Sequence, residues 1–250
     1  MLSDHALTRA LERVGLQAPV RFDEVTRSTQ ETALQMAADG APEWTLVAAG
    51  HQIEGRGRLG RSWEDEPDRA LMFSVVLRPD LPSELGGLVT LLAGSAMVDA
   101  CVEVAGRPAA CRWPNDVLVS GRKAAGILAE SLVAGDRFEH VVLGLGVNLG
   151  VPPKGQPDAG AVEAEDVDLL EAFLHAFVRR FEPAHPAFPG AVVAGYRRVC
   201  STIGARVRAT TVGGTVVEGE AVDVDEVGGL VVRVASGLEV VRFGEVEHLE

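Results

Sequence analysis

Residues 138–149 form a long run that is mostly apolar and rich in valine. A strand of this composition has no polar face to turn toward water, so protein must cover it on both sides. Fully covered strands of this kind lie in the middle of a sheet rather than at its edge. We therefore expect residues 138–149 to form a central strand.

Apolar periodicity and turn signals predict the other elements. Helices are expected over residues 3–14, 28–39, 84–105, 166–182 and 189–200. Strands are expected over residues 44–49, 71–77, 110–119 and 123–133. Ser28 and Glu31 have capping-box spacing at the start of the second helix, and Asp39-Gly40 is expected to end it. Ser120-Gly121 is expected to be the two-residue turn of a β-hairpin.

The pattern of residues changes at Thr202. From there on, short valine-rich runs are separated by Gly213-Gly214, Gly228-Gly229 and Ser236-Gly237. Such spacings are typical of a small β-barrel. The chain has 250 residues and 47% hydrophobic content, enough for a large core and a smaller one. The sequence therefore predicts a large domain over residues 1–200 and a small one over residues 201–250.

Residues 55–61 place three arginines in one glycine-rich loop, although the chain has a formal net charge of −13. A concentration of cations in one loop of an acidic protein predicts that the loop binds an anion. The loop also satisfies the Gly-x-Gly-x-x-Gly pattern of dinucleotide-binding folds, which requires a helix to begin at the loop. Residues 62–68 have no helical period and contain a proline, so we reject that interpretation. The alternative is a solvated surface loop.

Several classes of protein do not fit this sequence. The net charge of −13 argues against general nucleic-acid binding, and the arginine loop has no interleaved aromatic residues. Cys101, Cys111 and Cys200 are odd in number and have no metal-site spacing, which fits a reducing cytoplasm. We expect no secretory signal at the N-terminus. The uncharged stretch 85–98 has roughly 14 residues, too few for a membrane span, and is expected to be a buried helix.

Polar residues interrupt the predicted hairpin. Residues 112–116 read Arg-Trp-Pro-Asn-Asp, and the proline removes a ladder donor, so we expect this segment to bulge out of the sheet. The alternative is a turn that caps its own backbone with Asn and Asp. Lys123 should lie near Asp116 across the hairpin. One alternative is that Lys123 and Asp116 form a surface ion pair of little energetic value. The other is that Lys123 faces a crevice wall, because residues 124–128 are all small or apolar.

Asn148 follows Gly144-Leu145-Gly146-Val147 at the end of the central strand. Its side chain has a donor and an acceptor, suited either to reading an amide-like edge such as that of adenine or to capping a turn. Four features occur in a fixed order along the chain: a capping Ser-Thr, an Arg/Gly loop, a Trp-Pro-Asn-Asp kink with a downstream lysine, and a Gly-rich strand ending in Asn. In that order they resemble the biotin protein ligases, over essentially the whole chain from Arg21 onward.

The resemblance implies the fold and the activity. It implies an α+β fold, a mixed sheet with helices as in class II aminoacyl-tRNA synthetases and biotin–lipoate ligases, followed by a C-terminal SH3-like β-barrel. It implies an enzyme that makes biotinyl-5′-AMP from biotin and ATP with Mg²⁺, then transfers biotin to a lysine of the biotin carboxyl carrier domain of a carboxylase. A cytoplasmic ligase, monomeric or weakly dimeric, without a DNA-binding domain and without nucleic-acid or membrane partners, is expected.

The resemblance also implies three sets of site residues. The catalytic set is Lys123, Arg58 and Asp116, with Asp116 assigned either to Mg²⁺ or to deprotonating the incoming amine. The biotin-binding set is Ser28, Thr29, Gln30, Gln52, Gly55, Arg56, Gly57, Arg58, Trp63, Lys123 and Gly126. The ATP-binding set is Arg56, Arg58, Arg61, Trp63, Asn115, Lys123 and Asn148.

The sequence departs from the family pattern at three places. Gln30 stands where Asn is commoner, Arg112 where Lys is commoner, and Gly50-His51 where an acidic and an aromatic residue are more usual. Lipoate ligases and octanoyl transferases share the fold, but the Arg/Gly loop and the Trp-Pro-Asn-Asp segment favour biotin. A non-catalytic biotin sensor is a further alternative, and it would not need Lys123.

Overall fold

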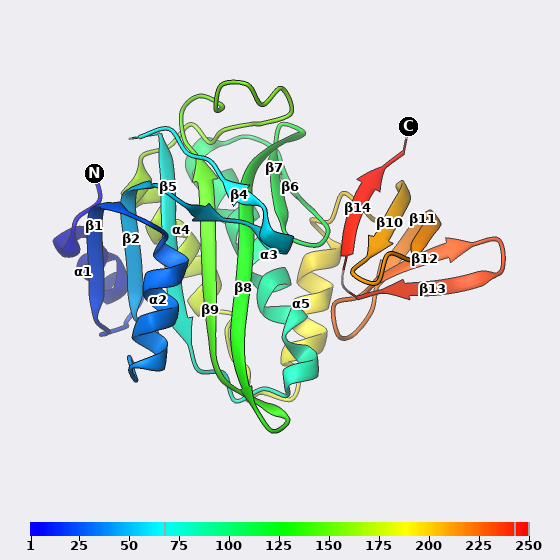
Figure 1. The fold of residues 1–250 in the computed structure, drawn as a ribbon, viewed down its shortest axis with the longest axis horizontal. Coiled ribbons are helices and arrows are strands. Elements are labelled where there is room, and N and C mark those ends of the chain that lie inside the picture. Colours follow the sequence, from blue (N-terminus) through cyan, green and yellow to red (C-terminus); the bar gives the residue numbers. More distant parts are fainter. Residues whose placement is uncertain (68, 243, 250) are drawn as a thin grey trace.

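A computed structural model describes residues 1–67, 69–242 and 244–249. Its largest element is a seven-stranded mixed sheet in the order β1-β2-β5-β9-β8-β7-β6 (Figure 1). These strands are β1 (Val20–Thr26), β2 (Leu46–Gln52), β5 (Ala70–Leu77), β9 (Arg137–Asn148), β8 (Arg122–Ala134), β7 (Asp116–Val119) and β6 (Ala109–Arg112). Only the β1–β2 pair of this sheet is parallel. The expected central strand is β9, which pairs with β5 on one side and β8 on the other.

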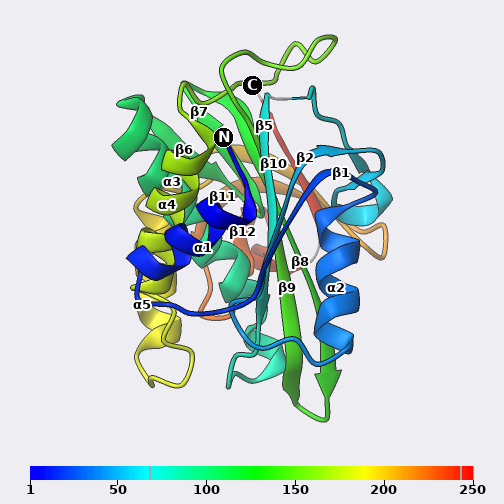
Figure 2. The ribbon, with the colours of Figure 1, turned by 90° about the vertical axis from the view of Figure 1, so that its left-hand side faces the viewer.

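Helices cover the two faces of this sheet unequally (Figure 2). One face carries α1 (Asp4–Arg13), α3 (Gly87–Ala105), α4 (Asp166–Val178) and α5 (Phe188–Arg197), whereas α2 (Thr29–Ala38) lies on the other. Short 3₁₀ helices, η1 (Arg58–Gly60) and η2 (Ser83–Leu85), connect some of the elements. The expected helices are therefore present, within a few residues of their predicted ends.

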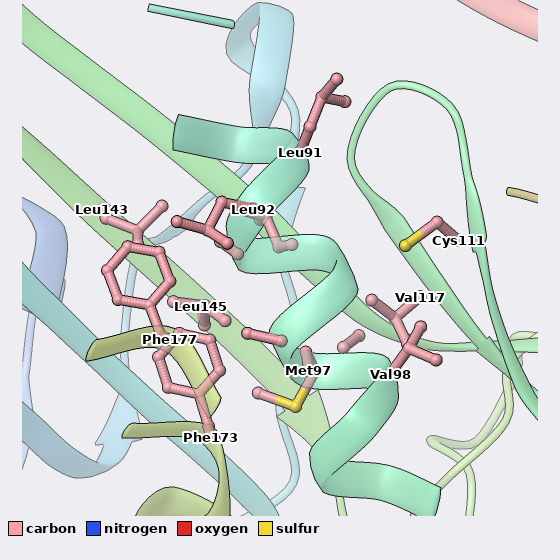
Figure 3. Packing of buried hydrophobic residues seen from close by; sticks show 14 of the residues in the cluster. Leu91, Leu92, Met97, Val98, Cys111, Val117, Leu143, Leu145, Phe173 and Phe177 are labelled. Carbon is pink, nitrogen blue, oxygen red and sulfur yellow. The ribbon is translucent and has the colours of Figure 1, made fainter. Parts of the chain in front are cut away.

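The main core surrounds α3, between Phe173 and Phe177 of α4 on one side and Cys111 and Val117 of the β6–β7 hairpin on the other (Figure 3). The segment Ser83–Ala105 is long and apolar enough to cross a membrane, yet 67% of its most apolar window is buried inside the protein. Its lack of charge is explained by burial, as the sequence predicted.

The opposite face of the sheet has a much smaller core. There α2 packs through Ala33 and Ala37 against one valine from each of three strands, Val47, Val76 and Val142. A ten-residue helix is about 15 Å long, whereas the twelve residues of β9 extend for about 40 Å. The helix α2 therefore leaves more than half of this face uncovered, and the candidate site lies there.

The start of α2 differs from the prediction. Ser28 is the N-cap residue, but its side chain makes no capping hydrogen bond, so the predicted capping box is wrong. Instead the side chain of Gln52 accepts a hydrogen bond from the Thr29 amide at 2.7 Å. A residue 23 positions away thus satisfies one of the four amides at the helix start that have no partner within the helix. Asp39 and Gly40 end the helix as predicted.

Residues 112–116 also differ from the prediction. The expected strand 110–119 is two strands, because β6 pairs antiparallel with β7 and Arg112 lies opposite Asp116. The segment is therefore the tip of a hairpin and not a bulge, and Asn115 donates to the Ile127 carbonyl at 2.8 Å rather than capping its own backbone. Ser120 and Gly121 form the predicted turn, with φ of 50° and 80°.

The C-terminal residues form a separate five-stranded antiparallel sheet in the order β13-β12-β11-β10-β14. These strands are β10 (Arg206–Thr211), β11 (Val216–Val224), β12 (Leu230–Val234), β13 (Gly237–Val241) and β14 (Gly244–His248). The predicted glycine turns connect them. Trp113 joins this sheet to the rest of the protein, because its backbone amide donates to Thr202 Oγ1 at 2.9 Å and its indole donates to the Gly228 carbonyl at 3.0 Å.

Candidate functional site

A cavity of about 580 Å³ lies over the part of the sheet that α2 leaves open. Its walls come from four places: the N-terminus of α2, the Arg/Gly segment, the tip of the β6–β7 hairpin, and β10 and β14 of the C-terminal sheet. The strands β8 and β9 form its floor. Both sheets therefore contribute to one site.

The Arg/Gly segment is a small hairpin. Strands β3 (Gly55–Arg56) and β4 (Ser62–Trp63) pair antiparallel, and η1 connects them. Leu59 and Gly60 both have positive φ, 56° and 76°, which turns the chain back sharply. No α-helix begins here, so the rejection of a dinucleotide fingerprint is confirmed. The hairpin crosses in front of β9 and β8 (Figure 1), and so lies over the cavity floor.

Each of the three arginines of this hairpin is bonded to another part of the protein. Arg56 pairs with Glu130 of β8 at 2.9 Å, and Arg61 pairs with Glu245 of β14. Arg58 donates to Asn115 Oδ1 at 3.1 Å and to the Gly244 carbonyl at 3.2 Å. Burial lowers the pKa of Arg58, while Asp116 and Glu245 oppose that shift. A partly desolvated guanidinium of this kind is suited to binding an anion.

Three glycines make the floor flat enough for a ring to lie on it. Gly126 of β8 and Gly146 of β9 are paired across the sheet, and the indole of Trp63 lies over both. A Cβ atom at Gly146 would lie 2.5 Å from Trp63 Cε2, and one at Gly144 would lie 2.4 Å from Gln30 Oε1. Trp63 and Gln30 can occupy these places only because the strand residues below them lack side chains.

A buried polar network lines the α2 end of the cavity. Thr29 Oγ1 lies 3.0 Å from Ser74 Oγ, which donates to Gln30 Oε1 at 3.1 Å, and Gln30 Nε2 donates to the Val142 carbonyl at 3.0 Å. Ser28 lines the cavity beside this network and is 1% exposed, yet its Oγ has no hydrogen-bond partner. A buried hydroxyl without a partner costs free energy, so Ser28 is placed to bond a ligand.

The opposite end of the cavity holds a line of charges. Asp116 Oδ1 lies 2.7 Å from Lys123 Nζ, and Asp116 Oδ2 accepts from Arg112 at 2.9 Å. The carboxylate is thus held between two cations, and Lys123 lines the cavity. The prediction that Lys123 lies near Asp116 in a crevice wall is confirmed. His248 of β14 also lines the cavity, and its pKa is lowered by burial and by Arg112.

The cavity brings together most of the residues that the sequence singled out, but not all. Gly55 and Asn148 do not line it. Asn148 is buried and its amide donates to the Gly160 carbonyl at 2.9 Å, so it bonds a loop twelve residues further along the chain. The lining residues that the predicted sets left out are Leu59, Ser62, Ser74, Arg112, Trp113, Pro114, Ile127, Leu128, Gly144, Leu145, Gly146, Arg208, Thr210, Glu245, Val246, Glu247 and His248.

Some of these omissions had a signal in the sequence. Alternating Gly144 and Gly146 inside a valine-rich strand is unusual, and it indicates close approach of another group. The C-terminal residues had none, because only the packing of the two domains brings β14 to the cavity. Among the described residues, no group of three or more His, Cys, Asp or Glu side chains could hold a metal ion.

Known proteins share this sequence and this fold. The profile of the Biotin/lipoate A/B protein ligase family matches residues 22–148, and that of the Biotin protein ligase C terminal domain matches residues 202–249. The Bifunctional ligase/repressor BirA of Bacillus subtilis (strain 168) is 32% identical over 253 residues, covering 94% of this chain and 77% of that protein. The Biotin--[acetyl-CoA-carboxylase] ligase of Mycobacterium tuberculosis (strain ATCC 25618 / H37Rv) is 37% identical over 239 residues, covering 90% and 86%.

A solved structure agrees in fold. The biotin protein ligase from Aquifex aeolicus in complex with biotin and ATP superimposes with a TM-score of 0.71 over 92% of this chain and 98% of that one. The two sequences are 24% identical, so the likeness concerns the fold.

Proposed function

Because the chain belongs to the Biotin/lipoate A/B protein ligase family, we propose that it joins biotin to AMP and then to a carrier protein. It is an ATP-dependent biotin protein ligase. One observation of the structure carries the proposal: a single cavity gathers Arg58, Lys123 and the unpartnered hydroxyl of Ser28 in a protein of net charge −13. Cations are needed there because both substrates are anions.

The reaction has two steps. A carboxylate oxygen of biotin forms a bond to the α-phosphorus of ATP, and the bond from that phosphorus to the pyrophosphate oxygen breaks. A lysine amine of the carrier then attacks the carboxyl carbon, loses a proton, and releases AMP. Negative charge grows on the phosphoryl oxygens in the first step, so fixed cations lower its barrier. Lys123 and Arg58 line the cavity and are proposed as these cations: Lys123 is held in place by Asp116, and Arg58 is bonded to uncharged oxygens of Asn115 and Gly244.

The residues at the α2 end suit the biotin ring system. Ser28, Thr29, Gln30 and Gln52 would orient the ureido ring, with Trp63 and the backbone at Gly126 as apolar walls. Gln30 already uses both ends of its amide within the protein, so its proposed role is to hold the network in place.

The opposite end would hold the nucleotide. Asn115 and Asn148 are proposed for adenine, although Asn148 would have to act from beyond the present cavity wall. Arg56 and Arg61 would exchange Glu130 and Glu245 for phosphate. Closure of the hairpin over the mixed anhydride would keep water from hydrolysing it.

Asp116 fits a role toward the amine better than a role as a metal ligand. Both of its carboxylate oxygens are already bonded to cations, Arg112 and Lys123. Mg²⁺ is proposed as the ion that accompanies ATP: phosphate oxygens and waters would be among its ligands, and its charge would offset part of the phosphate charge. Near the end of the second step, Asp116 would accept the proton of the incoming amine.

The wider assignments are proposals too. We assign catalysis to residues 1–200 and propose that residues 201–250 are an SH3-like barrel that closes the cavity. The partner would be the biotin carboxyl carrier domain of a carboxylase, and the ligase would act in the cytoplasm as a monomer or weak homodimer, without nucleic-acid or membrane partners.

Release of pyrophosphate tests the function directly. Purified protein, ATP and Mg²⁺ are incubated with biotin, with lipoate, or with neither. Pyrophosphate should appear with biotin only, and a carrier domain should then gain one biotin by intact mass. Release that does not depend on biotin, or biotin binding without any release, would refute the assignment; the second result would identify a sensor.

Ser28→Ala should weaken biotin binding without lowering the stability of the protein. Removal of a buried hydroxyl without a partner should leave the free energy of unfolding unchanged or raise it by up to about 1 kcal/mol. The KM for biotin should rise about tenfold, the value of one lost hydrogen bond to a ligand. Ser95→Ala is the matched control, because Ser95 is buried but donates to the Leu92 carbonyl within α3. An equal rise in KM for both variants would contradict the role of Ser28.

A further inference from the structure

Outside the cavity, His51 and Asp65 form a pair at the base of the Arg/Gly hairpin. His51 Nδ1 lies 2.8 Å from Asp65 Oδ2. His51 belongs to β2, which precedes the hairpin, and Asp65 follows β4, which ends it. The contact therefore brackets the whole hairpin, and neither residue lines the cavity.

The rest of the hairpin needs such an anchor. A two-stranded sheet of four paired residues is marginal by itself. Its arginines are bonded to Glu130, Asn115, Gly244 and Glu245, but these are the groups that must release them when phosphate binds. An anchor that persists throughout the reaction has to involve residues that do not touch substrate.

The two ends of the hairpin are held differently. On the incoming side, the backbone amides of Ile53 and Glu54 donate to the carbonyls of Thr26 and Arg27, both at 2.9 Å. On the outgoing side, the indole of Trp63 packs on Gly126 and Gly146 inside the cavity. Beyond it, Glu64 and Glu66 make exposed contacts of 3.3 Å with Gln156 and Lys154. Water competes with contacts of this kind, so they hold the chain weakly.

Asp65 differs from its neighbours because its side chain is fully buried, at 0% exposure, whereas that of His51 is 33% exposed. Asp65 Oδ1 is buried and has no partner, so the bond to His51 is the polar contact that the structure gives this carboxylate. A buried carboxylate is costly when unpaired. Loss of the imidazole should therefore drive Asp65 outward into water and carry the end of β4 with it.

We propose that His51 and Asp65 are positioning residues that hold the Arg/Gly hairpin closed over the cavity. The proposal rests on the ligase function for its effect on kinetics, but not for its effect on the hairpin itself. If the closed hairpin becomes a minor state, the apparent Kd for biotin equals the intrinsic Kd divided by the closed fraction, so the apparent affinity falls in proportion to that fraction. A saturated enzyme is closed again, so kcat for adenylate formation stays the same.

The test compares His51→Leu, which removes the donor, with His51→Asn, whose side-chain amide offers a donor near the position of Nδ1. His51→Leu should raise the KM for biotin about tenfold, leave kcat within about twofold, and raise the rate of biotinyl-5′-AMP escape about tenfold. His51→Asn should restore most of the KM. Glu54→Gln is the matched control, because it breaks the Arg27–Glu54 ion pair beside the same hairpin. The side chains of Arg27 and Glu54 are 63% and 60% exposed.

Limited trypsin digestion gives a readout that does not need activity, because the hairpin carries Arg56, Arg58 and Arg61. Mass spectrometry should show cleavage at these sites about tenfold faster in His51→Leu, and at the parental rate in His51→Asn and Glu54→Gln. Parental cleavage rates in His51→Leu, or equal acceleration in Glu54→Gln, would overturn the proposal. Absence of adenylate from the parent would refute the ligase assignment and leave the digestion result valid.

Discussion

Lys123→Ala should reduce biotin-dependent pyrophosphate release about 1000-fold. Lys123 Nζ lines the cavity and is held at 2.7 Å from Asp116, so its charge is fixed before the substrates arrive. Loss of one preorganised donor that stabilises charge in a transition state, as in an oxyanion hole, typically costs a factor of about 100 to 1000. Arg112 still bonds Asp116 in the variant, so the hairpin tip should keep its structure.

The control for this variant is the neighbouring Arg122→Ala. Arg122 is exposed and does not line the cavity, so its removal should leave the rate within about twofold. Biotin binding by titration calorimetry should show that the Lys123 variant still folds and still binds the vitamin. A Lys123→Ala enzyme that keeps more than a tenth of the parental rate would remove Lys123 from the mechanism and favour Arg58 as the principal cation.

Gly146→Ala should weaken biotin binding about 100-fold. The new Cβ would lie 2.5 Å from Trp63 Cε2 and 2.8 Å from Trp63 Nε1, which is closer than atoms can pack, so the indole must leave the floor. Trp63 is part of β4, and its displacement shifts the hairpin that carries the arginines. Overpacking of about 1–3 kcal/mol corresponds to a loss of about 5- to 150-fold in affinity.

Titration calorimetry with biotin on Gly146→Ala and on a second glycine variant would show whether the loss of affinity is specific to Gly146. Gly190 in α5 has open space around its Cα and no positive φ, so Gly190→Ala should bind biotin as the parent does and melt at the same temperature or higher. If Gly146→Ala binds biotin within threefold of the parent, the Trp63 indole can move aside with little loss of free energy, and the cavity floor is not rigid.

The interior of the large domain could be predicted from the sequence because burial leaves a local trace. The valine-rich run that became β9 and the uncharged run that became α3 each carry the composition of a covered element. The turn at Ser120-Gly121 was equally local. The predicted cap at Ser28 failed because the start of α2 is shaped by contacts distant in sequence: Gln52 accepts from the Thr29 amide, and the Ser28 side chain makes no capping bond.

The site was predicted in part for the same physical reason. Lys123 and Asp116 lie on neighbouring strands, so their proximity follows from hairpin geometry. Glu245 and His248 reach the cavity because the C-terminal sheet packs against the rest of the protein, through Trp113 among other residues, and no local pattern encodes that packing. Asn148 had two reasonable roles in the sequence, and the loop that passes over it decides which atoms its amide meets.

The ion pair between Arg61 and Glu245 and the bond from Arg58 to the Gly244 carbonyl cross between the two domains. The small sheet is therefore not an interchangeable module. In a chimera that takes its C-terminal sheet from a relative, the relative's residue at position 245 would have to come together with the relative's residue at position 61. Homologues that differ at one of these two positions should accordingly tend to differ at the other.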